Sequence, residues 1–279
     1  MEKSKFIWGS RTYLMGIINL TPDSFSGDGL ADRKDPVHAA LEQTIRFKNE
    51  GADIIDLGAE SSRPGAEIIS SAEELERLMP TLTAIIKEDL DVIVSVDTFK
   101  SSVADQSLRA GADWINDIWG LRADKKLAEI VAHYQAGIVI MHNGRELFSN
   151  NGISVEQPED ILQQVKADLS SCIALARQAG IHTNKIILDP GLGFGKNREQ
   201  NLELINRLDE LKEMGFPILV GPSRKSFIGS TLNLPPAQRL EGSSASVAIS
   251  IARGADILRV HDVQAMFRVA RMSDAIVRH

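Results

Sequence analysis

Short apolar runs recur eight times along this chain, and stretches with the apolar spacing of helices separate them. The runs are mostly continuously apolar, which is typical of strands buried on both faces of a parallel sheet. We expect these strands at residues 14–18, 53–57, 92–96, 114–118, 138–141, 185–188, 217–220 and 257–260. Eight strands alternating with helices predict an α/β protein built as a closed (β/α)₈ TIM barrel, with an open doubly wound sheet as the alternative.

The segments between these runs carry signals for helix starts and helix ends. Asp35-Pro36 predicts an N-cap followed by proline in the first turn, Ser71–Glu74 fits a capping box, and Gln157-Pro158 is expected to open a later helix. Six glycines precede strands, as expected of residues in the left-handed conformation at helix C-termini. They are Gly51, Gly111, Gly137, Gly180, Gly215 and Gly254.

Composition limits the class of protein further. Nothing in the 279 residues resembles a linker, so we expect one domain over 1–279, with residues 1–11 as a short N-terminal extension. The net charge of −7 argues against a general nucleic-acid binder. No apolar run has the length of a membrane helix, and the N-terminal MEKSKFIWGS has no apolar signal core, so we expect a cytoplasmic protein. The single cysteine, Cys172, excludes a disulfide framework and is expected to be buried and inert.

Polar side chains follow each of the eight predicted strands. The carboxyl ends of the strands of a (β/α)₈ barrel converge on one face, so we expect these side chains to meet there. An aspartate after a strand is most often a helix cap or a turn former, and Asp117 and Asp262 can be explained in that way. Agreement among eight strand ends favours a ligand site, because buried polar groups need partners.

The side chains at these ends divide into two groups by charge. Four are cationic or can become so, and they are suited to a phosphate or pyrophosphate: Arg63, Lys225, Arg259 and His261. Three can bind the N–H and amino edge of a flat heterocycle: Asp97, Asn116 and Asp189. Lys225 can also donate to a carbonyl of the same ring. The pattern therefore predicts a substrate with a polar ring at one end and an anionic leaving group at the other.

Two further segments bear on cofactors. DPGLGFGK at 189–196 does not fit a P-loop, because its glycine spacing is wrong and asparagine follows the lysine, and we interpret it as a tight loop that places Phe194 near the site. No pair of histidines has the spacing of metal ligands. Mg²⁺ held mostly by phosphate oxygens, with Asn19 as a protein ligand, suits this site. We assign the segment MHNGRELFSNN at 141–151 no role beyond a loop.

Taken together, the motifs resemble those of the dihydropteroate synthase family over essentially the whole chain. The matching stretches are INLTPDSFS (18–26), ESSRPGA (60–66), SVDTFK (95–100), INDI (115–118), LDPGLGFGK (188–196), VGPSRKSFIG (220–229) and RVHDV (259–263). The resemblance implies a transferase that joins 6-hydroxymethyl-7,8-dihydropterin pyrophosphate to p-aminobenzoate in folate synthesis. It also implies a homodimer and inhibition by sulfonamides.

The resemblance assigns roles to single residues. The pterin would be bound by Asp97, Asn116, Asp189, Lys225 and Arg259. Pyrophosphate would be held by Asn19, Ser62, Arg63, Arg259 and His261, with Asn19 also reaching Mg²⁺. Ser223 would meet the carboxylate of p-aminobenzoate, in a pocket shaped by Phe25, Pro64 and Phe194. The expected catalytic set is Asn19, Arg63, Asp97, Lys225, Arg259 and His261.

The expected mechanism is substitution in which pyrophosphate leaves first, because the electron-rich dihydropterin can stabilise the resulting cation. Two alternatives stay open at this stage. One is the pterin-binding barrel of corrinoid-dependent methyltransferases, which would not need the cationic groups of SRK (223–225) and RVH (259–261). The other is a pterin-binding homologue with impaired catalysis, since the first loop reads SFSGDG where the family commonly has SFSDGG.

Overall fold

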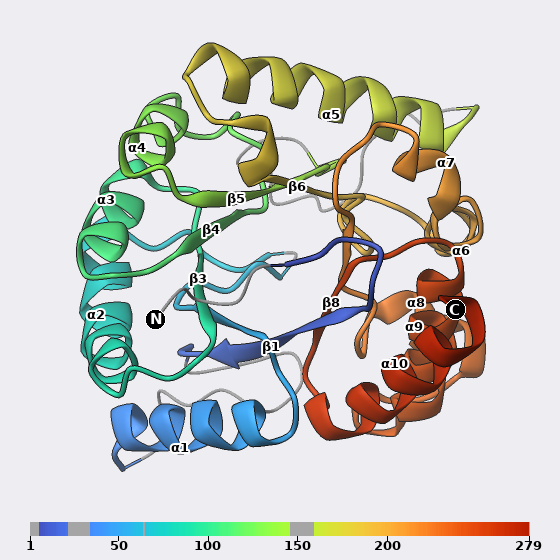
Figure 1. Ribbon diagram of the computed structural model, residues 1–279, viewed down its shortest axis with the longest axis horizontal. Coiled ribbons are helices and arrows are strands. Elements are labelled where there is room, and N and C mark those ends of the chain that lie inside the picture. The colour runs from blue at the N-terminus through green and yellow to red at the C-terminus, as the bar shows by residue number, and fades with distance from the viewer. Residues whose placement is uncertain (1–5, 22–33, 64, 146–158, 279) are drawn as a thin grey trace.

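The computed structural model describes residues 6–21, 34–63, 65–145 and 159–278. Within these ranges eight strands form one sheet, and all neighbouring strands run parallel. The strand order is β6-β5-β4-β3-β2-β1-β8-β7, and a parallel bridge between Leu188 and Ile218 joins the two ends. The sheet is therefore closed into a barrel (Figure 1), which confirms the predicted fold and sets aside the open doubly wound sheet.

Every predicted strand is present, with ends that differ from the prediction by two residues at most. The strands are β1 Tyr13–Asn19, β2 Ile54–Gly58, β3 Ile93–Asp97, β4 Trp114–Asp117, β5 Gly137–Met141, β6 Ile186–Asp189, β7 Leu219–Val220 and β8 Ile257–Val260. Asn19, Asp97 and Asp189 are the last residues of their strands. The polar groups predicted to follow the strands are thus held, in these three cases, by the strands themselves.

Helices surround the barrel on its outside (Figure 1). They are α1 Pro36–Asn49, α2 Ser71–Lys87, α3 Ser101–Arg109, α4 Leu127–Tyr134, α5 Ile161–Gln178, α6 Arg198–Asn206, α7 Leu208–Lys212, α8 Ser226–Leu232, α9 Leu240–Ala252 and α10 Val263–Val277. Their apolar faces pack on the outward side chains of the strands, such as Ile55, Val94 and Leu258, in one large core. This packing explains why the strand sequences are apolar on both faces.

The interior of the barrel changes from apolar to polar along its axis. A small cluster takes at least one side chain from each strand, including Ile54, Ile93 and Trp114. Side chains in a strand alternate between its two faces, so the residues two positions further on also point inward. Five of these positions are polar, namely Asp56, Ser95, Asn116, Asp189 and Arg259, and they give a largely polar layer directly below the carboxyl ends of the strands.

Helix starts confirm one prediction and correct another. Asp35 caps α1 by accepting a hydrogen bond from the His38 N–H at 3.0 Å, and Pro36 follows it as predicted. The capping box at Ser71–Glu74 is wrong by one residue, because Ser70 caps α2 by accepting from the Glu73 N–H. Gln157-Pro158 lies outside the described residues, and α5 begins at Ile161 with Asp160 as its cap.

The glycine prediction holds at five of the six positions within the described chain. Positive φ angles occur at Gly51, Gly111, Gly180, Gly215 and Gly254. Gly137 is instead the first residue of β5, and Gln135 takes the left-handed conformation before it (φ 51°). Glycine is required at 137 for a packing reason, since a Cβ atom there would lie 2.4 Å from Cδ1 of Trp114.

The end of the barrel opposite to the polar layer is closed by aromatic residues. The rings of Phe6 and Trp8 stack with centroids 4.9 Å apart, and Phe6 also contacts Tyr13 and Trp114. Cys172 is buried, and burial raises the pKa of its thiol to about 11, in agreement with the expected inert cysteine. In the described parts of the chain, no helix combines the length and the apolar character needed to cross a membrane.

Candidate active site

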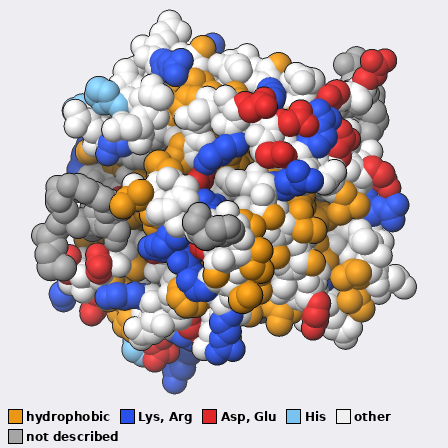
Figure 2. Space-filling view, turned by 45° about the vertical axis from the view of Figure 1, so that its right-hand side comes forward, with side chains coloured by type: hydrophobic (Ala, Val, Ile, Leu, Met, Phe, Trp, Pro, Cys, Tyr) orange, Lys and Arg blue, Asp and Glu red, His pale blue; other side chains and the backbone are white. Residues whose placement is uncertain are grey.

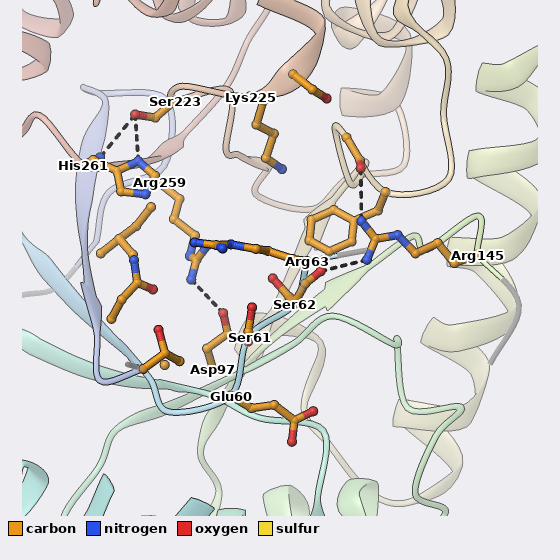
Figure 3. Close-up of a pocket in the computed structure, with 17 residues that line it drawn as sticks. Glu60, Ser61, Ser62, Arg63, Asp97, Arg145, Ser223, Lys225, Arg259 and His261 are labelled. Atoms are coloured by element: carbon orange, nitrogen blue, oxygen red, sulfur yellow. Dashed lines mark hydrogen bonds and ion pairs between the residues drawn. The ribbon is translucent and has the colours of Figure 1, made fainter. Parts of the chain in front are cut away.

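A cavity of about 290 Å³ lies at the carboxyl end of the strands. Nine residues predicted for the site are among the described residues that line it: Asn19, Ser62, Arg63, Asp97, Phe194, Ser223, Lys225, Arg259 and His261. The side chains of Arg63 and Arg259 both point into its middle (Figure 3). Phe25 and Pro64 lie outside the described residues. The ends of the strands therefore bring together groups that are up to 242 positions apart in the sequence (19 to 261).

Arg259 joins two carboxylates on the floor of this cavity. Its Nε donates to Oδ2 of Asp56 at 2.6 Å, and its Nη2 donates to Oδ2 of Asp97 at 2.7 Å. Burial raises the pKa of Asp97 to about 7, although the positive charge of Arg259 opposes this change. Asp56 was missed by the sequence analysis. The available signal was an aspartate inside the otherwise apolar run IIDLG.

Asn116 and Asp189 are buried, and neither is among the described residues that line the cavity. Asn116 is 3% exposed and donates from Nδ2 to Asp56 at 3.0 Å. Asp189 is 6% exposed and accepts a 2.7 Å hydrogen bond from the Gly191 N–H. Burial raises the pKa of Asp189, and the positive charge of Lys225 opposes that shift. A ring reaching these two side chains would have to enter the barrel itself.

Lys225 and Phe194 form one wall of the cavity. The Lys225 ammonium donates to the Leu192 carbonyl and lies 4.6 Å from the centroid of the Phe194 ring. Burial lowers the pKa of Lys225 to about 8, while the nearby Asp189 opposes this shift. The prediction that the glycine-rich loop places Phe194 at the site is confirmed, because Phe194 lines the cavity.

The segment at 141–151 contributes to the cavity, contrary to the prediction that it is only a loop. Residues 146–151 lie outside the described chain, but Arg145 lines the cavity. Its guanidinium donates to the Ser62 carbonyl at 2.8 Å and to the Gly193 carbonyl at 3.4 Å, and lies 4.7 Å from the Phe194 centroid (Figure 3). Arg145 therefore connects the loop after β2 to the glycine-rich loop after β6.

The loops after β7 and β8 are fixed to each other by side chains. The Ser223 hydroxyl lies 3.1 Å from Nδ1 of His261 and accepts from the His261 N–H. Beside this contact, Arg224 pairs with Asp262, with Nη2 to Oδ1 at 2.5 Å. Asp262 thus forms an ion pair and makes no side-chain cap to α10 among the described residues. Asp117, by contrast, accepts from the N–H groups of Trp119 and Leu121 and is the turn former that the sequence suggested.

An ion triad holds the loop after β2 from below. Lys100 donates to both Glu60 and Glu74, and Glu60 also lines the cavity. Burial raises the pKa of Glu60, although its bond with Lys100 opposes the shift. This buried role of Glu74 also explains the misplaced capping box, since Glu74 faces Lys100 rather than the helix start.

Comparison with known proteins supplies the family. Residues 15–261 match the model of a family described as pterin binding enzyme. The dihydropteroate synthase of Clostridium beijerinckii is 48% identical over 275 residues, which cover 98% of this chain and 97% of that protein. The chain belongs to the dihydropteroate synthase family. As a member of this family it is a transferase.

Solved structures agree with this assignment. The dihydropteroate synthase of Clostridium difficile, crystallised in the presence of pteroic acid, superposes with a TM-score of 0.90 at 44% identity and covers 99% of this chain and 100% of its own. The Yersinia pestis enzyme, solved with a sulfonamide drug, also has a TM-score of 0.90, at 38% identity, covering 97% of this chain and 96% of that one. The resemblance drawn from the motifs is confirmed, and the corrinoid methyltransferase alternative is set aside.

The described part of the cavity offers few protein groups that could hold a metal ion. Among the described residues no cluster of three or more His, Cys, Asp or Glu side chains could hold a metal ion. Asn19 lines the cavity together with Arg63 and with His261, which can become cationic. One neutral amide oxygen beside an anion-binding surface fits a hard cation that takes most of its ligands from phosphate and water.

Proposed function

We propose that the protein condenses 6-hydroxymethyl-7,8-dihydropterin pyrophosphate with p-aminobenzoate, giving 7,8-dihydropteroate and pyrophosphate. One observation carries the proposal: a single cavity has buried carboxylates on its floor and cationic side chains above them, at the carboxyl end of a barrel. Family membership supports the same reaction, because close relatives over the full chain length are named for it.

The pterin ring binds at the floor in this proposal. Asp97, Asn116 and Asp189 supply acceptors for its N–H and amino groups, and Lys225 donates to its carbonyl. Arg259 lies beside the ring, since it already pairs with Asp97 on the floor. The depth of Asn116 and Asp189 supports a flat ligand that enters the barrel edge-on.

The pyrophosphate binds above the floor. Arg63, Arg259 and His261 carry or can carry positive charge there, and Ser62 and Asn19 add polar groups. Guanidinium groups bind phosphate oxygens in pairs, which suits two arginines facing one leaving group. Asn19 would hold Mg²⁺ jointly with pyrophosphate oxygens. When bound, Mg²⁺ supplies further positive charge to the leaving group.

The p-aminobenzoate binds on the side of Phe194 and Ser223. The ring face of Phe194 suits an aromatic substrate, and the Ser223 hydroxyl suits its carboxylate. Arg145 extends this wall and adds positive charge. Phe25 and Pro64, predicted for the same pocket, lie outside the described residues, so their contribution stays a prediction. Sulfonamides, which a relative binds, are the expected competitors at this place.

The mechanism follows from the distribution of charge. Pyrophosphate departs first, and Arg63, Arg259 and His261 stabilise the negative charge that develops on it. The carboxylates of Asp97 and Asp189 favour the cation left on the dihydropterin. The amine of p-aminobenzoate, held in line by its own pocket, then attacks the methylene carbon. No covalent enzyme intermediate is required.

The quaternary structure belongs to the same proposal. Ile249 of α9 and Met272 and Ile276 of α10 are 49%, 63% and 59% exposed, and hydrophobic side chains gather on this side of the molecule (Figure 2). A homodimer through α9 and α10 would cover them. Met272→Glu should give a monomer by light scattering, while Ile45→Glu on α1 should remain dimeric; a monomeric unmodified protein would contradict the dimer. The cytoplasmic location also stays a prediction.

The decisive experiment is a coupled assay of pyrophosphate release by the purified protein with Mg²⁺. Release that requires both the pterin pyrophosphate and p-aminobenzoate, together with 7,8-dihydropteroate in the product, supports the function. No release above the background without enzyme would overturn it and would favour the catalytically impaired homologue. Release without p-aminobenzoate would identify a hydrolase and would also overturn the proposal.

A further inference from the structure

Asp56 occupies the centre of the polar layer inside the barrel. It lies in the middle of β2, it is fully buried, and it is not among the described residues that line the cavity. Its carboxylate accepts from the Ser95 hydroxyl at 2.6 Å, from Nδ2 of Asn116 at 3.0 Å and from Nε of Arg259 at 2.6 Å. These three donors come from β3, β4 and β8, so Asp56 connects four strands.

An ionised carboxylate can only accept hydrogen bonds, and this fixes the groups around it. The amide of Asn116 must direct its NH₂ toward Asp56, because its carbonyl oxygen there would face another acceptor. Oδ1 of Asn116 is therefore the atom presented to a ligand. Arg259 is held by its Nε, which leaves the Nη end of its guanidinium to reach Asp97 and the cavity.

We propose that Asp56 is a positioning residue for the reaction, which makes Asn116 a hydrogen-bond acceptor toward the pterin and fixes the plane of the Arg259 guanidinium. The inference rests on the proposed function, since it names how two groups of that site are oriented. Asp56 itself touches no substrate in this scheme. It acts through Asn116, which binds the ring, and through Arg259, which lies beside the ring and also faces the leaving group.

Asparagine at position 56 is the informative replacement because it keeps the shape and removes the charge. In Asp56→Asn the ion pair with Arg259 is lost. The new amide can present either its oxygen or its NH₂ to Asn116, because the Ser95 hydroxyl on its other side can accept as well as donate. The Asn116 amide is then no longer forced into one orientation. We expect the Kd of 6-hydroxymethylpterin, measured by calorimetry, to rise at least tenfold. The KM of p-aminobenzoate should stay within about twofold, which a general loosening of the barrel would not produce.

Asp53→Asn is the matched control on the same strand segment. Asp53 precedes β2 at the opposite end of the barrel and pairs with Arg11 at 2.6 Å, so its replacement also removes a carboxylate with an arginine partner. It should lower thermal stability without changing pterin affinity. If Asp56→Asn does not fold, Ser95→Ala removes one of the donors and keeps the charge, and a Kd two- to fivefold higher is expected.

The outcomes separate this inference from the proposed function. The role of Asp56 is supported if the unmodified enzyme binds the pterin and turns over, and if pterin binding is weakened only in the variants at Asp56 and Ser95. Unchanged pterin affinity in Asp56→Asn overturns the role of Asp56 and leaves the proposed function intact. If Asp56→Asn does not fold, unchanged affinity in Ser95→Ala has the same meaning. Equal losses for both substrates, or an equal loss in Asp53→Asn, also overturn it. Failure of the unmodified enzyme to bind 6-hydroxymethylpterin overturns both.

Discussion

Replacing Arg145 by methionine should weaken the binding of p-aminobenzoate selectively. The change keeps an unbranched apolar stem, and it removes two hydrogen bonds to carbonyl groups and the contact of the guanidinium with Phe194. The 2.8 Å bond to Ser62 is exposed to solvent, so we assign it about 1 kcal/mol, which is below the usual range for a charged donor. The 3.4 Å bond to Gly193 adds little, and an exposed cation–π contact adds about 0.5–1 kcal/mol.

The sum of these terms is about 2 kcal/mol, which corresponds to a factor of roughly 30 at about 1.4 kcal/mol per tenfold change. This value is the upper limit, because part of the loss is recovered when the loops relax. We therefore expect the KM of p-aminobenzoate to rise about 10- to 30-fold. The KM of the pterin pyrophosphate should stay within about twofold, since the contacts of Arg145 are with the two loops above the floor.

Initial rates of pyrophosphate release measure both constants, with each substrate varied while the other is saturating. Arg145→Lys keeps a cation near Phe194 but cannot span both carbonyl groups, so it should give an intermediate KM. Arg122→Met, in the connection between β4 and α4, is the control. Arg122 donates to the Asn143 carbonyl at 3.1 Å but is not among the described residues that line the cavity. An unchanged KM for p-aminobenzoate in Arg145→Met, or equal increases for both substrates, would refute the assignment.

Three further predictions test the floor, the glycine-rich loop and the metal. Burial raises the pKa of Asp97 to about 7, and the pterin ring needs the ionised carboxylate as an acceptor, so affinity for 6-hydroxymethylpterin should fall as the pH drops below about 7. Asp97→Asn should bind the pterin weakly at every pH. A pH-independent affinity in the unmodified enzyme would contradict this role. Gly191→Ala should lower the free energy of unfolding by more than about 3 kcal/mol, because Gly191 has a φ of +68° and a Cβ atom there would lie 1.9 Å from the His142 carbonyl oxygen. The control is Gly180→Ala, where a Cβ atom would meet no described atom within 4 Å, and it should lower the free energy of unfolding by only about 1–2 kcal/mol. Urea denaturation measures both values. Mg²⁺ should tighten binding of inorganic pyrophosphate in calorimetry, and Asn19→Ala should remove that gain; an equal gain in both proteins would exclude Asn19 as a ligand.

The strand-end residues could be predicted because two local signals coincide in the sequence. A continuous apolar run marks each strand, and a barrel brings the residues at its carboxyl end to one face. Asp97, Lys225 and Arg259 needed no further information. Asp56 was missed because it lies inside its run, where the neighbouring isoleucines and leucine identify a strand and conceal the inward face. The two-residue alternation that puts Ile54 in the apolar cluster would have pointed Asp56 inward as well.

Other errors arose where the tertiary structure decides between equivalent local patterns. Ser70 and Ser71 are adjacent, as are Glu73 and Glu74, so a capping box fits in either register. The ion pair of Glu74 with Lys100, 26 positions away, selects the register that the local pattern leaves open. Arg145 escaped prediction for a related reason. Its position over the cavity depends on the path of a connection whose sequence carries no strand or helix period.

The charges around the cavity favour departure of pyrophosphate before attack by the amine. With Asp97 ionised, the floor holds the carboxylates of Asp56, Asp97 and Asp189 against the cations Arg259 and Lys225, which leaves one net negative charge. Above the floor, Arg63 is cationic and His261 can become so. As the bond to pyrophosphate breaks, positive charge develops on the ring beside the floor, and negative charge moves toward the arginines. Both changes are stabilised by charges already in place, so the cavity favours the charge-separated state over the intact pyrophosphate ester.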